Sequence, residues 1–169
     1  MKKRLTLVLL GLLALSSAIS AGCSSSSANS TQNEPTLRSK YLLNSTISVK
    51  PDHSTEGRRL AYYDVPFKIT SAMKNPSVQG IISAIGGMGP YAAVYVLDDS
   101  SFKNWINRNE GVTILYSLGA EMVATMNVSI TAPGTYHLVF YHIPVIIPGG
   151  ALIDRPAKVG AHIKLQWYQ

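Results

Sequence analysis

The chain has 169 residues, of which 46% are hydrophobic and 14% charged, and its formal net charge is +6 at pH 7. This length allows one domain with a sizeable core, and a single cysteine excludes a disulfide within the chain, so apolar burial and backbone hydrogen bonding must hold the fold. The cations are spread along the sequence without a clustered basic motif, which argues against a nucleic-acid-binding protein.

The N-terminal segment has the format of an export signal. Lys2-Lys3-Arg4 is followed by an apolar run from Leu5 to Leu15 and by the small residues Ser20-Ala21-Gly22, which precede Cys23. The apolar run is shorter than the ~20 residues that span a bilayer comfortably. We therefore expect residues 1–22 to be a signal peptide that is removed, which takes three cations away and leaves a mature charge of about +3.

The residues around Cys23 resemble the lipobox of bacterial lipoproteins, in which Ser20 replaces the leucine that the family prefers. The resemblance implies that the Cys23 thiol carries a diacylglycerol and that its freed amine is acylated. Two or more chains anchor a protein stably, whereas one chain anchors it marginally. An ordinary secretory signal with a free thiol and a retained membrane helix are the alternatives. The resemblance implies an extracytoplasmic lipoprotein of the cell envelope, and Ser24 favours the outer membrane where two membranes exist.

Residues 24–36 form the polar sequence SSSSANSTQNEPT. Such a segment cannot offset its ordering entropy by burial, so we expect residues 23–36 to be a disordered tether with a reach of about 20 Å. The folded domain is then expected to span residues 37–169.

The domain is expected to be nearly all β. Apolar and polar residues alternate with period two in segments 61–69, 122–130 and 161–168, which predicts strands with one buried face. Pro66 places the first of these at a sheet edge or a bulge. Segments 78–85, 91–97 and 135–142 are apolar on both faces and predict more deeply buried strands.

One helix is expected near residues 100–107. Asp99 or Ser100 can cap its first turn, and Phe102, Trp105 and Ile106 form an apolar stripe at helical spacing. Segment 111–118 predicts the next strand. The fold class is therefore all-β: a single antiparallel β-sandwich of about seven to eight strands with one short helix.

The region from Gly80 to Tyr168 contains VYVLDDSSFKNW at 94–105, PGTYHLVF at 133–140 and HIKLQWY at 162–168. In this order the motifs resemble prokaryotic extracytoplasmic sandwich domains similar to the GOLD domain of emp24-type cargo proteins. The apolar insertion at 141–150 departs from that pattern. The resemblance implies a non-catalytic binding or accessory module.

Little in the sequence indicates catalysis or a cofactor. The four histidines, His53, His137, His142 and His162, show no metal-ligand spacing, and His137 and His142 are expected on opposite strand faces. Asp98-Asp99 is better explained by helix capping than by calcium binding. No Gly-x-Ser-x-Gly elbow is present, and Gly86-Gly87-Met88-Gly89 precedes a strand rather than a helix. We predict no catalytic residue, no metal and no cofactor.

Two features suggest a binding surface. The strands are rich in aromatic residues, which could stack on sugars, although tyrosine also packs well in strands. The apolar loop 143–152 could form a patch for a partner or cover the core. A lipid-anchored binding or accessory module with an unidentified protein or glycan partner is the main hypothesis. A carbohydrate-binding surface module is the first alternative, and a hydrolase with an unrecognised triad is the second.

Overall fold

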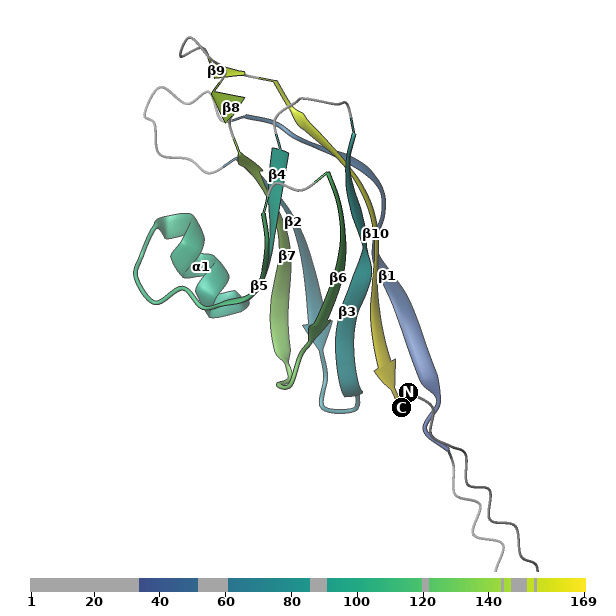
Figure 1. Cartoon of the computed structure of the whole chain (residues 1–169). Coiled ribbons are helices and arrows are strands. Elements are labelled where there is room, and N and C mark those ends of the chain that lie inside the picture. Colours follow the sequence, from purple (N-terminus) through teal and green to yellow (C-terminus); the bar gives the residue numbers. More distant parts are fainter. Residues whose placement is uncertain are drawn as a thin grey trace, which may run out of the picture. The chain divides into compact units, whose positions relative to one another are not determined.

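The computed structural model describes residues 34–51, 61–85, 91–119, 122–143, 145–146, 152–153 and 155–169, all within one compact unit, Glu34–Gln169 (Figure 1). The predictions for the signal peptide, for Cys23 and for most of the tether lie outside the described residues. So do His53, the Gly86–Pro90 turn and most of the 143–152 loop.

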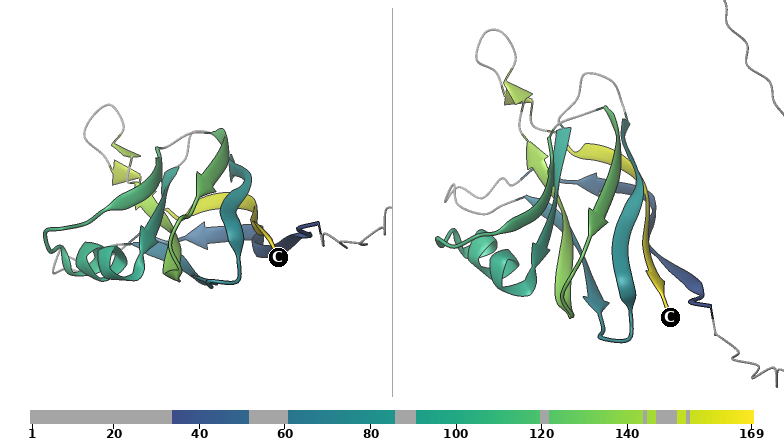
Figure 2. Two further views of the ribbon diagram at one scale, coloured as in Figure 1. Left: turned by 90° about the horizontal axis from the view of Figure 1, so that it is seen from below. Right: turned by 60° about the horizontal axis from the view of Figure 1, so that its bottom comes forward.

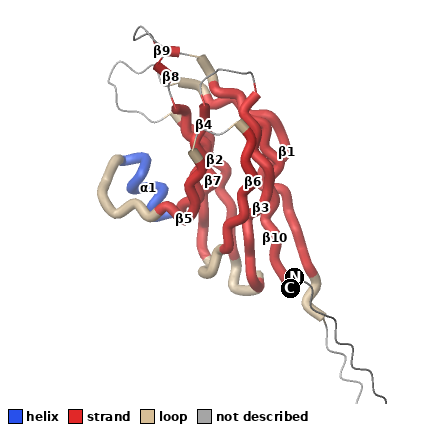
Figure 3. Tube along the Cα trace, viewed as in Figure 1, coloured by secondary structure: helices blue, strands red, loops and turns tan. Residues whose placement is uncertain are grey.

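Two four-stranded antiparallel sheets and one helix make up most of the described structure. Figure 3 shows the strands in red and the helix in blue. Sheet I contains, in spatial order, β1 (Leu37–Val49), β10 (Ala157–Tyr168), β3 (Lys74–Ile85) and β6 (Val123–Ser129). Sheet II contains β2 (Tyr62–Ile69), β7 (Gly134–Ile143), β4 (Tyr91–Asp98) and β5 (Ile114–Leu118), and helix α1 spans Asp99–Asn107. The short strands β8 (Val145–Ile146) and β9 (Leu152–Ile153) pair with each other.

The strand order is that of a jelly roll. The first strand pairs with the last, β2 pairs with β7, β3 with β6 and β4 with β5, so the chain folds as nested antiparallel pairs divided between two sheets. The two sheets face each other in both views of Figure 2. The all-β sandwich predicted from the period-two pattern is confirmed, and this topology is one of the ways in which all-β domains limit their exposed sheet edges.

The core lies between the inner faces of the two sheets. Its members are buried residues on alternate positions, as period-two alternation requires. Phe140 and Leu138 on β7, Val94 on β4, Val78 on β3 and Ile163 on β10 are fully buried. The inward set of β10 predicted from sequence, Ala161, Ile163, Leu165 and Trp167, belongs to this core or packs against it.

Proline marks an edge strand, as the sequence predicts. Pro66 lies opposite His137 in β2, and β2 is the outermost strand of sheet II. An edge strand tolerates the missing N–H because one side of its ladder has no partner.

The helix begins one residue earlier than expected, and its cap is different. Asp98 is the N-cap, and its carboxylate accepts the backbone N–H of Ser101 at 2.7 Å and the hydroxyl of Ser100 at 2.8 Å. The prediction that Asp99 or Ser100 caps the helix is therefore wrong. Asp99 instead lies in the first turn, where a negative charge favours the helix dipole and binds the Lys103 ammonium at 2.7 Å.

Strand β3 departs from the prediction of two buried faces. Val78 and Ile82 point into the core, whereas Ile81 and Ile85 are about half exposed on the outer face of sheet I. β4 and β7 do have two buried faces, because α1 lies against the outer face of sheet II. The amino-acid pattern of β3 is apolar on both sides, but no described element covers its outer side.

Different parts of the chain lie at the two ends of the sandwich. Thr36 and Gln169 exchange two backbone hydrogen bonds of 3.1 Å, so the entry of the chain into the fold and its C-terminus lie together, next to the β2–β3 turn (Figure 1). We call this the terminal end. The described parts of β1, β3 and β7 finish at the opposite end, at Val49, Ile85 and Ile143.

Candidate functional site

The outer face of sheet II holds a second, small core under α1. Leu97, Phe102 and Val139 are buried there, and Trp105 and Ile106 pack against them. Phe102, Trp105 and Ile106 are the stripe predicted at helical spacing, so the sequence located the buried face of the helix correctly. These contacts fix the helix on the sheet.

His137 is the titratable group at the centre of this region. Its Nδ1 donates to the Asp64 carboxylate, at 3.1 Å from Oδ1 and 3.0 Å from Oδ2, and its ring stacks on Phe102 with the centroids 3.9 Å apart. Its Nε2 is buried and lies 3.5 Å from Asp99 Oδ1, and it has no hydrogen-bond partner among the described residues. His137 thus links β2, β7 and the start of α1.

The charged groups near His137 favour a structural role for this histidine, which links α1 to the sheet. Lys103 is the main cause of the lowered pKa of the Asp99 carboxyl, and His137 contributes less. The hydrogen bond from the Ser101 N–H is the main cause of the lowered pKa of Asp98. Both carboxylates are therefore held ionised at the N-terminus of the helix, where they cap it or bind a cation.

A catalytic triad would need a hydroxyl that reaches the free nitrogen of the histidine. Ser101 is the buried hydroxyl nearest in the chain to Asp99, but its Oγ accepts the backbone N–H of Thr113 at 3.1 Å. Within the described ranges, no hydroxyl hydrogen-bonds to His137. The stacked ring of Phe102 also covers one face of the imidazole, so no triad geometry is present at His137.

A metal centre finds little support among the described residues. Nε2 of His137 and Oδ1 of Asp99 could supply two donors, but the second oxygen of Asp99 binds the Lys103 ammonium, which repels a metal cation. No group of three acidic, histidine or cysteine side chains suited to a metal occurs in the described part of the chain.

The other described histidines are bound to polar groups elsewhere. Nε2 of buried His142 donates to the Arg155 carbonyl oxygen at 3.2 Å, and Nδ1 of His162 donates to Asn44 on the outer face of sheet I. His137 and His142 lie on opposite faces of β7, as the sequence predicts.

The aromatic residues near α1 pack against one another. Tyr62, Tyr95 and Tyr141 each meet Trp105 edge to face, at interplanar angles of 73–89°. A sugar-stacking platform presents ring faces to solvent, whereas these rings turn edges onto faces. This group of aromatic residues therefore serves packing, and the sequence pattern alone did not distinguish the two uses.

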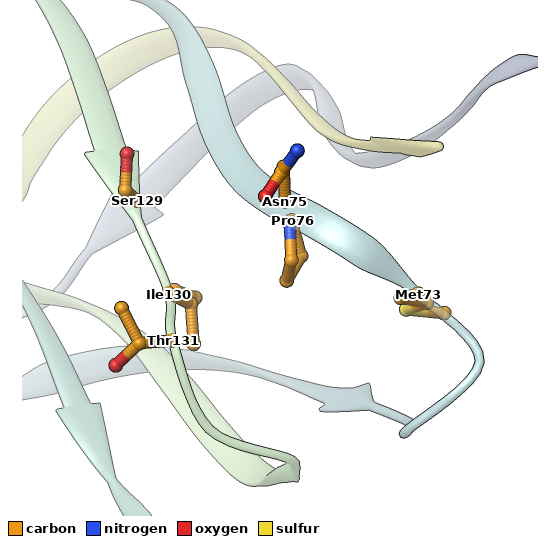
Figure 4. A pocket seen from close by; sticks show the side chains of 6 residues that line it. All are labelled: Met73, Asn75, Pro76, Ser129, Ile130 and Thr131. Atoms are coloured by element: carbon orange, nitrogen blue, oxygen red, sulfur yellow. The ribbon is translucent and has the colours of Figure 1, made fainter. Parts of the chain in front are cut away.

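Two of the hollows lined by described residues open at the terminal end. The first, of about 450 Å³, is lined by Met73, Asn75 and Pro76 before and at the start of β3 and by Ser129, Ile130 and Thr131 at the end of β6 (Figure 4). It contains no charged side chain among its lining residues. Three of its lining residues are apolar and three carry short polar side chains, and no motif in the sequence predicted it.

The second hollow, of about 220 Å³, lies where the edge strands β1 and β2 diverge. Its lining combines lysines with aromatic side chains: Lys40, Tyr41, Leu42, Val65, Pro66, Phe67, Lys68, Met73, Leu165 and Trp167. The Lys164 ammonium lies 4.7 Å from the centre of the Tyr41 ring. These residues come from β1, β2 and β10 and, for Met73, from the turn between β2 and β3, so no local motif could have revealed them.

Comparisons with known proteins do not assign a family. No family model and no curated protein matches the chain. A solved structure of the infectious bursal disease virus, Gt strain, aligns with 94% of this chain and 38% of its own chain, at 12% sequence identity and a TM-score of 0.38. The chain thus spans well under half the length of that protein. No helix in the described ranges is both long and apolar enough to cross a bilayer.

Proposed function

We propose that this protein is an extracytoplasmic lipoprotein whose β-sandwich acts as a non-catalytic binding or accessory module. The observation that carries the proposal is Cys23, the only cysteine, placed directly after a basic, apolar and small-residue segment. Acyl chains on Cys23 hold the protein in the cell envelope, at the outer membrane where there are two membranes.

Features of the folded part support this proposal. The core between the sheets is continuous and uses no disulfide, so the domain can fold outside the cytoplasm with its one thiol free for lipidation. The described sandwich begins at Thr36, which leaves the polar segment after Cys23 as the connection to the membrane. The proposed resemblance of residues 80–168 to GOLD-like sandwiches agrees with a binding role.

The test is replacement of the acylated residue. Cys23→Ala should move the protein from the detergent phase to the aqueous phase on detergent phase partitioning, because no thiol remains to accept a diacylglycerol. Ser25→Ala, in the same polar segment, is the matched control and should leave the partition unchanged. If Cys23→Ala partitions like the unchanged protein, lipid anchoring through Cys23 is wrong.

A further inference from the structure

Five cations collect at the terminal end although they are separated in the sequence. Arg38 and Lys40 lie at the start of β1, Lys68 near the end of β2, Lys74 at the start of β3, and Lys164 in β10. Strand pairing brings them together, since Lys40 lies opposite Leu165 and Lys74 opposite Tyr168. We call Arg38, Lys40, Lys68, Lys74 and Lys164 the basic end.

Two of these cations line one hollow, and strand pairing places a third beside it. Lys40 and Lys68 line the same 220 Å³ hollow beside Trp167, and Arg38 is paired with Trp167 across the β1–β10 ladder. No ion pair joins any of the five to a described acidic side chain. Their charges are therefore available to a partner.

The acidic side chains are arranged differently. Asp98 and Asp99 are engaged in capping α1 and binding Lys103, and Asp64 binds His137 on the outer face of sheet II. Near Thr36, Glu34 is the described acidic residue that precedes the basic end. The five cations of this end outnumber the one described acidic side chain near it, and this excess of positive charge is complementary to an anionic surface.

Exposed tyrosine and leucine side chains accompany the cations. Tyr41 is 49% exposed, Tyr168 is 39% exposed, and Leu37, which pairs with Tyr168, is 53% exposed. Tyrosines with neighbouring lysines suit the headgroup region of a membrane, where a ring contacts the acyl boundary and the cations meet phosphate. A soluble polyanion would use the cations but would not need exposed Leu37.

The position of the basic end favours a membrane surface over a soluble polyanion as its partner. The chain enters the fold at Thr36, beside this end, and the segment from Cys23 to Thr36 is short enough to keep it near the anchoring membrane. We propose that the basic end docks on the anionic phospholipid headgroups of the membrane that holds Cys23, which orients the opposite end of the sandwich away from the bilayer. This inference rests on the proposed lipid anchoring.

The experiment measures docking without the anchor. Residues 23–169 carrying Cys23→Ser keep the whole compact unit and cannot be acylated. Their binding is measured by co-sedimentation with vesicles of phosphatidylcholine alone and of phosphatidylcholine containing phosphatidylglycerol, at low and high salt. We expect binding only to the anionic vesicles, weakened by salt because exposed charges are screened.

A matched pair of triple variants locates the surface. Lys40→Gln, Lys68→Gln and Lys74→Gln together should weaken binding about a hundredfold, at roughly fivefold for each lysine. Lys50→Gln, Lys103→Gln and Lys158→Gln remove the same charge elsewhere and should weaken it less than about threefold. Arginine at the same three positions of the basic end should restore binding, and thermal melting verifies that each variant is folded.

Several results would overturn the docking proposal. Equal weakening by the two triple variants would mean that net charge acts without a defined surface. Binding to inorganic polyphosphate or nucleic acid without binding to anionic vesicles would identify a soluble polyanion as the partner. If the protein does not bind anionic vesicles but Cys23→Ala still moves it to the aqueous phase, docking is wrong and the lipid anchor stands. If it binds the vesicles but Cys23→Ala leaves its partition unchanged, the lipid anchor is wrong and docking on anionic headgroups stands.

Discussion

The outer faces of the two sheets have similar strand patterns but differ in how deeply their apolar side chains are buried. In sheet II, α1 covers the outward residues, and Leu97 and Val139 are fully buried. In sheet I, Ile81 is 52% exposed at an equivalent outward position in the middle of β3. An apolar residue on a strand therefore predicts burial only where another element is available to cover it.

The largest expected effect separates the two faces directly. Val139→Ser should lower the free energy of unfolding by about 3 kcal/mol, because it leaves a cavity and buries a hydroxyl under α1. Ile81→Ser should change it much less, by about 0.5 kcal/mol, because about half of this side chain is already exposed and no described element packs on it. Urea unfolding of both variants measures the difference, and equal effects would show that the outer face of sheet I is covered in solution.

The sequence predicted most of what depends on local pattern. The edge position marked by Pro66, the two-sided burial of β7 and the apolar stripe of α1 follow from spacing and backbone chemistry alone. The pairing of β1 with β10 could not be predicted, because it joins Leu37 to Tyr168 across nearly the whole domain. The basic end depends on that pairing, so its cations look scattered in the sequence.

The site under α1 was predicted only in part. The sequence placed Phe102 and Trp105 on one helix face, but it gave no sign that His137 would bind Asp64, which is 73 positions away. Strand β2 must pair with β7 before these two residues meet. A histidine between apolar residues of a strand was the available signal, and such a histidine is found in many cores.

Two histidines, one on each outer face of the sandwich, should differ in the same way. His137→Ala should destabilise the domain by about 2 kcal/mol, because it removes a charge-assisted hydrogen bond to Asp64 and the stacking on Phe102. His162→Ala, on the exposed face of sheet I, should cost less than about 0.5 kcal/mol. Thermal unfolding of both variants at one pH checks this, and a larger loss at His162 would contradict the proposed roles.

Removing the helix cap should lower the stability by a smaller amount. Asp98→Ala should cost about 1 kcal/mol, because the Ser101 N–H loses its acceptor at the start of α1. Circular dichroism with urea unfolding measures the loss. Ser100→Ala, which removes only a hydroxyl donor to Asp98, is the control and should cost less. An unchanged stability of Asp98→Ala would mean that packing alone fixes the helix.

The cap also predicts a pH dependence. The folded-state pKa of Asp98 is lowered from 3.8, mainly by the hydrogen bond from the Ser101 N–H, so its contribution is present above that value and is lost as the pH falls through the folded-state pKa. The stability of the unchanged protein should therefore decline below about pH 4, and the decline should be shallower in Asp98→Asn. Urea unfolding across this pH range measures both slopes, and identical slopes would contradict the assignment.

Mass spectrometry of the protein extracted from membranes tests directly whether Cys23 is the point of attachment. We expect a mature chain whose first residue is Cys23, with a diacylglycerol on its thiol and residues 1–22 absent. A chain that begins at another residue, or one in which the Cys23 thiol is unmodified, would show that Cys23 does not anchor the protein.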